Sequence, residues 1–379
     1  MAHRETQMAP VRPRALIKGR PEDFVVEEVP AYEPSGSGEH VFVRFTKRGL
    51  TTLEAVDRLG EALGCDPREA GHAGMKDKHA VTTQTVSFHA PRGVDPRDVA
   101  ARARTAAVEA ITVVDATPHE HKIKPGHLLA NRFSIALRDL DAARLPEIVA
   151  AFERIAREGV PNSFGRQRYG ARGDNVPRAL AWLRGEERGP RDPRRRRLLW
   201  SAVQSAVFDA VLEARLADGT YGTPLAGDLL KLHASGGLFS CSDPTTDRSR
   251  AEAGELSPTG PIVGARMRWP EGEVLALERR VSTSVLGEGF DLDRTRRLGE
   301  GTRRALRVWA QDLRWETPQG HSSDDTGHRG QSMWVHFMLT KGAYATTVLE
   351  AAVTPEEPGS GDRGNVDPEE ASEPVSDGP

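Results

Sequence analysis

Partial alternation of apolar and polar residues near the start of the chain predicts β-strands. Residues 23–29 (DFVVEEV) and 41–46 (VFVRFT) are rich in Val and Phe, and a loop rich in Gly and Ser, 34–40, lies between them. The segments 84–90, 110–115 and 132–138 have the same β-branched character. The first part of the chain is therefore expected to build a sheet.

Helical periodicity interrupts these strands. Residues 51–64 begin with Thr51 and Glu54 at capping-box spacing, continue with apolar residues three or four positions apart, and end at Gly64. The same kind of pattern predicts helices over 145–159, 198–219, 266–281 and 301–315. Residues 332–352 predict a strand, a glycine turn and a final helix. Strands and helices thus alternate irregularly, which favours an α+β fold.

The character of the chain changes after Gly170. Residues 171–197 are strongly charged, the long helical pattern 198–219 follows, and residues 220–265 are rich in Gly, Pro and Ser. Strand periodicity returns only near the end of the chain. We therefore expect a sheet-rich domain that is interrupted by a largely helical insertion and completed by the segment that follows it.

The charge is unevenly distributed. The chain carries −3 overall, but residues 354–379 contain eight acids and one base and carry −7, so residues 1–353 carry +4. The tail has no aromatic residue and many prolines and glycines, so it is expected to be disordered. The rest of the chain is mildly basic, which permits a nucleic-acid partner without requiring one.

Composition excludes several classes of protein. No apolar run is long enough to cross a membrane, and the basic N-terminus lacks the apolar core of a signal peptide. Two distant cysteines exclude a disulfide framework and a Cys-rich zinc site. We therefore expect a cytoplasmic protein.

A small histidine cluster lies at 119–127. A metal site there is disfavoured because Lys122 and Lys124, interleaved among the histidines, would repel a cation. The lysines favour contact with phosphates instead.

Asp77 is the strongest candidate for chemistry. It lies between Lys76 and Lys78 in the segment GMKDKHAVTTQ, 74–84. Nearby cations favour an ionised carboxylate and hold its pKa low, and such a carboxylate can act as a nucleophile or a base. Taken alone, the triplet is more typical of a solvated turn, and only its companion motifs favour the catalytic interpretation.

Two further segments combine features of RNA-binding surfaces. GVPNSFGRQRYG, 159–170, places arginines beside Phe164 and Tyr169, which suits phosphate contact and base stacking, or a structural junction between domains. Asn131 stands beside Phe133 at the start of a predicted strand, so an amide could meet a base edge while a ring stacks on the base.

Five segments in order resemble the TruD family of tRNA pseudouridine synthases, and together they span nearly the whole chain except the tail. The second matches the family pattern G-x-K-D-x-x-A-x-T-x-Q, and the fourth is close to GVPNYFG-x-QR-[FY]-G. Ser163 and Thr340 depart from the family patterns. The segments are 21–40, 74–84, 131–139, 159–170 and 336–351.

The resemblance implies an enzyme that breaks the uridine N-glycosidic bond and rejoins the base through C5, with no cofactor and no metal. It assigns the catalytic role to Asp77 and implies tRNA as partner, with uridine 13 of the D arm as the target. It further implies a single chain that acts without a membrane. The implied substrate-binding residues are Lys18, Phe24, Lys76, Asn131, Phe133 and Phe337. The expected RNA contacts are Lys78, Lys122, Lys124, Arg166, Gln167 and Arg168.

The resemblance also implies a division of the chain: a pseudouridine-synthase catalytic domain with a mixed antiparallel sheet, and an inserted α/β TRUD domain beside it. The expected parts are 1–160 and 305–353 for the catalytic domain, 161–304 for the insertion, and 354–379 for the tail. Two alternatives remain open. One is an RNA-binding protein without catalysis, and the other is a metal-dependent nuclease, for which Asp77 between two lysines is a poor ligand.

Overall fold

The computed structural model describes residues 11–170, 173–316 and 330–358. Within these residues a ten-stranded sheet has the order β14-β15-β7-β2-β5-β3-β6, and three short strands, β1, β4 and β16, attach to it. Its longer strands are β2 (Phe24–Pro30), β3 (His40–Arg48), β5 (Val81–His89), β6 (Ile111–His119), β7 (Leu128–Leu140), β14 (Gln311–Glu316) and β15 (Gln331–Thr340). The short strands are β1 (Arg14–Leu16), β4 (Gly71–His72) and β16 (Thr354–Glu356).

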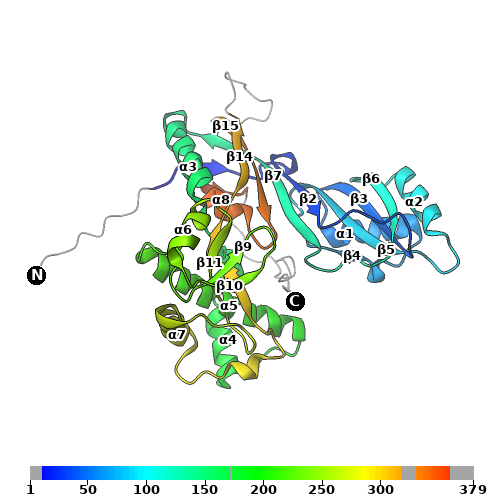
Figure 1. Cartoon of the computed structure of the whole chain (residues 1–379). Coiled ribbons are helices and arrows are strands. Elements are labelled where there is room, and N and C mark those ends of the chain that lie inside the picture. The colour runs from blue at the N-terminus through cyan, green and yellow to red at the C-terminus, as the bar shows by residue number, and fades with distance from the viewer. Residues whose placement is uncertain (1–10, 171–172, 317–329, 359–379) are drawn as a thin grey trace, which may run out of the picture.

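Two hydrophobic cores lie along this sheet. Buried residues of β3, β5 and β6 pack with α1 (Thr52–Leu63) and α2 (Pro96–Thr105), and these elements form one lobe in Figure 1. Buried residues of β2, β7 and β15 pack with α3 (Leu145–Glu158) and α8 (Ala345–Glu350). The capping box predicted for α1 is confirmed, because Thr51 accepts a hydrogen bond from Glu54 N and Glu54 accepts one from Thr51 N.

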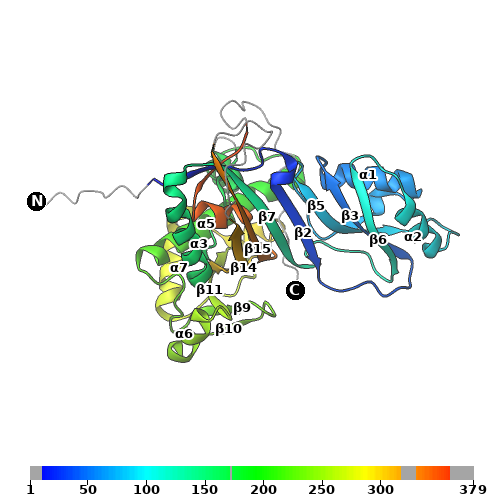
Figure 2. The same ribbon diagram turned by 90° about the horizontal axis from the view of Figure 1, so that it is seen from above.

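Strand β2 joins the two halves of the sheet. It pairs antiparallel with β7 and parallel with β5, where Val25 lies opposite Val81. Parallel neighbours begin at the same edge of a sheet. The segments that precede β2 and β5 therefore lie at the same end, although about 60 residues separate them in sequence. Figure 2 shows β2 and β5 side by side.

The segment between the two parts of the large sheet has a sheet of its own, with the order β10-β9-β11-β12. Its strands are β9 (Leu229–Leu232), β10 (Leu238–Ser240), β11 (Leu256–Ile262) and β12 (Thr302–Ala305). Its helices are α4 (Asn175–Arg184), α5 (Pro193–Ala217), α6 (Pro244–Glu252) and α7 (Gly272–Leu286). The chain enters this part through β8 (Val160–Pro161) and leaves through β13 (Arg307–Val308), and these two strands pair with each other. The expected α+β fold with an inserted segment is therefore confirmed.

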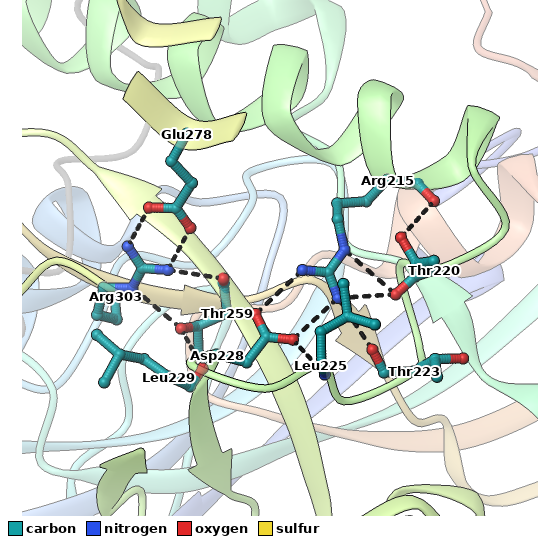
Figure 3. A network of polar contacts seen from close by, with 9 residues as sticks. All are labelled: Arg215, Thr220, Thr223, Leu225, Asp228, Leu229, Thr259, Glu278 and Arg303. Carbon is teal, nitrogen blue, oxygen red and sulfur yellow. Dashed lines mark hydrogen bonds and ion pairs between the residues drawn. The ribbon is translucent and has the colours of Figure 1, made fainter. Parts of the chain in front are cut away.

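Two buried ion pairs hold α5 and α7 to the small sheet (Figure 3). Arg215 of α5 bonds both oxygens of Asp228 at 3.0 and 3.1 Å, and Arg303 of β12 bonds both oxygens of Glu278 at 2.6 and 2.7 Å. Arg303 also donates to Thr259 on the neighbouring strand β11. Each charge thus has several partners, which a buried charge requires.

The helix predicted over 301–315 is wrong. These residues form β12, β13 and β14, which pair with β11, β8 and β15 in turn. The Ala, Leu and Arg content favours a helix locally, but three strand edges elsewhere in the chain offer hydrogen-bond partners. Tertiary pairing therefore overrides local preference here.

The predicted disorder of the acidic tail does not begin at Thr354. Thr354–Glu356 form β16, which pairs in parallel with β1, and Ile17 N donates to Glu356 O at 2.9 Å. The free edge of β1 supplies the backbone partners that the tail composition does not reveal. Residues 359–379 lie outside the described part of the chain.

The helices in the described part of the chain lack the combination of length and apolar character that a bilayer span requires.

Gly159 has a backbone conformation that glycine alone readily adopts, at the point where the chain enters the insertion. Its φ of 68° and ψ of −169° are almost restricted to glycine, and an added Cβ would lie 2.7 Å from Val308 O. Gly159→Ala is predicted to lower the free energy of unfolding by about 2–4 kcal/mol in urea unfolding. Gly93→Ala is the matched control, because its φ is 80° with no atom within 4 Å. There the loss is expected to be about 1 kcal/mol, and equal losses in the two variants would contradict the prediction.

Candidate active site

Asp77 lies in the loop that precedes β5, at the edge of the sheet where β2 also begins. Its side chain is 55% exposed, and Oδ2 lies 3.1 Å from Nζ of Lys18. Lys18 follows β1 and has a positive φ of 54°, an uncommon conformation for a lysine. The parallel pairing of β2 with β5 therefore brings a carboxylate and an ammonium group together from distant parts of the sequence.

Lys18 has a second carboxylate and an aromatic ring beside it. Its Nζ is 3.1 Å from Glu357 Oε1 and 4.8 Å from the centre of the Phe24 ring. Burial by itself lowers the pKa of Lys18, but the carboxylates of Asp77 and Glu357 outweigh it, so the pKa is raised. Lys18 is therefore a cation at neutral pH, and it contacts Asp77, Glu357 and the ring of Phe24.

The contact with Glu357 follows from strand pairing. β1 and β16 run parallel, with Leu16 opposite Glu356, so the residues that follow the two strands emerge side by side. Lys18 and Glu357 occupy these positions. The beginning of the acidic C-terminal segment thus reaches the site, which nothing in the sequence indicated.

The two lysines that flank Asp77 bind other carboxylates. Lys76 Nζ lies 2.6 Å from Glu28 Oε2, and both side chains are almost fully buried. Lys78 Nζ lies 3.0 Å from Glu54 Oε1 at a half-exposed position. The structure therefore does not place Lys76 among the groups open to a substrate; Lys18 is the lysine that pairs with Asp77. The N–H of Thr51 and the ammonium group of Lys78 lower the pKa of Glu54 to about 2.

Three aromatic side chains continue from Lys18 into the sheet. Phe24 and Phe133 meet edge to face with ring centres 6.3 Å apart, and Phe133 stacks on Phe337 at 5.4 Å. Phe133 and Phe337 are directly opposite each other on β7 and β15. All three rings are buried. The structure thus brings together the aromatic residues that sequence reasoning selected.

Asn131 lies on the same strand as Phe133, two residues earlier, and so faces the same side of the sheet. In the register of β2 with β7 it is opposite Glu28, the partner of Lys76. Its Oδ1 is buried and accepts no hydrogen bond within the described residues. A buried amide oxygen without a donor is a natural acceptor for a ligand N–H.

The loop between β6 and β7 carries Lys122 and Lys124, and both are exposed. This loop docks beside the loop that carries Asp77, because Gly126 N donates to Ala73 O at 2.8 Å. In the neighbouring histidine cluster, His119 Nδ1 accepts from Ser35 N. The described residues contain no group of three or more side chains suited to hold a metal ion.

The segment 159–170 forms a junction between the two parts of the fold. Phe164 N donates to Asp209 of α5 at 3.0 Å, and Tyr169 also donates to Asp209. Arg168 donates to Ser205 at 3.2 Å. The Arg304 guanidinium lies over the Phe164 ring at 4.2 Å. These contacts support the structural interpretation of the segment. The side chains of Arg166 and Gln167 lie outside the described part.

Sequence reasoning missed three residues of the site: Glu28, Lys47 and Glu357. Lys47 is fully buried beneath the loop of Asp77, although the alternation of β3 marks it only as one more charged residue. Glu28 follows Glu27 in a predicted strand, and the sequence pattern does not mark either one as a residue of the site. Only their long-range partners identify these three residues.

Comparison with known proteins shows the family of the chain. The family model of tRNA pseudouridine synthase D (TruD) matches residues 13–185 and 192–351. The tRNA pseudouridine synthase D of Anaeromyxobacter sp. (strain Fw109-5) is 42% identical over 341 residues, covering 88% of this chain and 90% of the relative. That of Thermus thermophilus is 36% identical over 334 residues, covering 88% of this chain and 87% of the relative.

The fold has a solved counterpart as well. A crystal structure named for tRNA pseudouridine synthase D (TruD) from Methanosarcina mazei matches with a TM-score of 0.67 at 20% identity, covering 90% of this chain and 94% of that one. The family match, together with the fold, defines a protein of the pseudouridine-synthase class. The chain belongs to the TruD family of tRNA pseudouridine synthases.

The two lysines beside Asp77 are predicted to differ sharply in their effect on stability. Lys76→Met leaves the buried carboxylate of Glu28 without its cation, so the free energy of unfolding is expected to fall by about 3–5 kcal/mol. Lys78→Met removes only a half-exposed ion pair, for which a loss below about 1 kcal/mol is expected. Urea unfolding of both variants measures the two losses, and similar losses would contradict a buried Lys76–Glu28 ion pair.

Proposed function

We propose that this chain is a tRNA pseudouridine synthase that converts uridine 13 in the D arm of tRNA to pseudouridine, with Asp77 as the nucleophile. The observation that carries the proposal is the Asp77–Lys18 pair, 3.1 Å apart, at the end of the aromatic set. Membership of the TruD family supports the reaction type, and the exposed side chain of Asp77 is open to a substrate.

Each residue of the set has a role in this reaction. The bond from ribose C1′ to uracil N1 breaks and a bond from C1′ to C5 forms, while C5 loses its proton and N1 gains one. The reaction is therefore an isomerisation and needs no other reactant. Asp77 supplies the attacking carboxylate oxygen, and Lys18 orients it. Phe24, beside Lys18, is the ring we assign to contact with the base, and Phe133 and Phe337 pack behind it. Asn131 Oδ1 can accept the N3–H of uracil.

The target base has to leave its stack in the tRNA before Asp77 can reach it. Unstacking costs a few kcal/mol, and stacking on an aromatic side chain recovers about 1–3 kcal/mol per base. Phosphates on either side of the base then need cations. We assign this contact to the exposed Lys122 and Lys124, to Lys78 and, in the junction segment, to Arg166 and Arg168, with Gln167 as a neutral hydrogen-bond donor.

We further propose the division of the chain that the family resemblance implies, with the insertion between the paired strands β8 and β13. In this arrangement tRNA contacts both the catalytic part and the insertion. The protein acts as a single chain in the cytoplasm.

Asp77→Asn tests the nucleophile directly. The amide cannot form the covalent bond, so pseudouridine formation on tRNA that lacks modifications is expected to fall by at least about 1000-fold. Binding of the same tRNA is expected to stay within a few-fold of the wild type. Site-specific mapping of pseudouridine measures the product and its position. Full activity in the variant would end the nucleophile assignment, and product at another position would overturn the assignment to uridine 13.

Glu357 is predicted to weaken RNA binding by occupying Lys18. Replacing it as Glu357→Gln frees the ammonium group for a phosphate, and a partly exposed pair of this kind is worth up to about 1 kcal/mol, so affinity for tRNA is expected to rise by up to about fivefold at low salt. Glu356→Gln is the control, because Glu356 pairs with Arg14 at an exposed position. Fluorescence anisotropy with labelled tRNA measures both. Equal affinities for both variants and the wild type would refute the competition.

A further inference from the structure

Lys47 is a fully buried lysine whose Nζ has backbone carbonyls as its hydrogen-bond partners. It lies on β3, with its side chain beneath the loop that carries Asp77. Its Nζ donates to the carbonyl of Leu50, to that of Asp77 at 2.9 Å and to that of Lys76 at the longer distance of 3.5 Å. Lysine is almost never fully buried without such partners. Lys47 therefore ties the backbone of the catalytic loop to β3.

We propose that Lys47 is a positioning residue, whose ammonium group fixes the backbone at Lys76 and Asp77 and thereby aims the Asp77 carboxylate at Lys18 and the substrate. The inference rests on the proposed function, because it assumes that Asp77 reacts. It goes beyond that function by assigning the loop geometry to a residue that touches neither substrate nor reacting atoms.

The other contacts of the loop leave this role to Lys47. Lys76 N donates to Thr52 Oγ1 at 2.9 Å, and Lys76 Nζ pairs with Glu28. These contacts anchor the residue before Asp77. Within the described residues, Lys47 supplies the side-chain donor to the carbonyl of Asp77 itself. Because a shift of about 1 Å in a reacting group can cost about 100-fold in rate, a defect at this carbonyl is expected to affect the chemical step.

The number of N–H groups makes this contact sensitive to protonation. An ammonium group has three N–H donors, which matches the three carbonyls, whereas a neutral amine has two donors and a lone pair. Three charged groups face Lys47: Asp77 and Glu54 favour the cation, and Lys76 opposes it. Burial outweighs the two carboxylates and lowers the pKa of Lys47 to about 8. Above that pH one of the three carbonyl contacts is lost.

The lowered pKa of Lys47 is expected to make the fold more stable as pH rises, although the loop contact weakens. The unfolded chain keeps the proton on Lys47 up to a pKa of about 10.4, whereas the folded chain releases it at about 8. Between these values the unfolded state binds more protons, so this group makes the fold more stable as pH rises. Activity is expected to fall over the same range because the loop loosens. A purely structural lysine would move activity and stability in the same direction.

The experiment compares the wild type with Lys47→Met. Single-turnover and steady-state rates on tRNA that lacks modifications are measured from pH 7 to 9, together with urea unfolding at each pH. For Lys47→Met we expect kcat to fall by about 10- to 100-fold at pH 7 with little change in KM. The wild-type rate is expected to fall as pH rises, with a midpoint near pH 8. This falling limb of the pH–rate profile is expected to be absent from Lys47→Met. Lys231→Met, on β9 of the insertion, is the control and is expected to keep this fall in rate. A variant with wild-type kcat and the same limb overturns the proposal.

Hydrogen exchange of the loop amides, 75–80, provides a readout that does not depend on activity. In the wild type without RNA, protection corrected for intrinsic exchange is expected to fall as pH passes 8, and this measurement needs no variant to fold. Constant protection from pH 7 to 9 overturns the proposal. If protection falls as expected but the wild type makes no pseudouridine, the proposed function fails while the positioning of the loop by Lys47 stands.

Discussion

The parallel pairing of β2 with β5 is the constraint on which the site depends. Most neighbouring strands of the large sheet are antiparallel, and antiparallel neighbours begin at opposite edges. The single register Val25–Val81 to Glu27–Thr83 brings the beginnings of β2 and β5 to the same edge. Lys18 and Asp77 stand just before these beginnings. The second parallel pair, β1 with β16, likewise brings Glu357 beside Lys18. Strand direction thus decides which charges can meet.

Three lysines around Asp77 show how environment divides the work of one residue type. Lys18 lies between two carboxylates and stays cationic, because their charges outweigh the effect of burial. Lys76 is neutralised by Glu28 inside the sheet. Lys47 has carbonyls in place of a carboxylate, and burial lowers its pKa to about 8. Asp77 therefore has three lysines around it, and each of them lies in a different electrostatic environment.

The insertion is joined to the large sheet by few but specific contacts. β8 and β13 pair where the chain enters and leaves, and Gly159 permits the turn before β8. Arg304 then lies against Phe164 and donates to Gly342 O at 2.7 Å, in the segment that follows β15. Phe337 lies on β15. A continuous set of contacts therefore leads from the insertion to the strand that carries one of the aromatic residues of the site.

Local patterns in the sequence determined much of the fold and singled out Asp77 as the candidate nucleophile. Alternation located β2, β3, β5, β6 and β7, and the Thr51 and Glu54 capping box located the start of α1, because these signals depend on residues a few positions apart. The ordered motifs, through the resemblance to the TruD family, proposed Asp77, Phe24, Asn131, Phe133 and Phe337 as site residues.

Only the tertiary structure decided what depends on long-range pairing. Residues 301–315 became strands because β11, β8 and β15 offered edges, against their helical preference. Lys18 rather than Lys76 or Lys78 became the partner of Asp77, and Lys47 and Glu357 entered the site. In each case the partner is set by strand direction and register between distant segments, and neither property is encoded in the spacing of neighbouring residues.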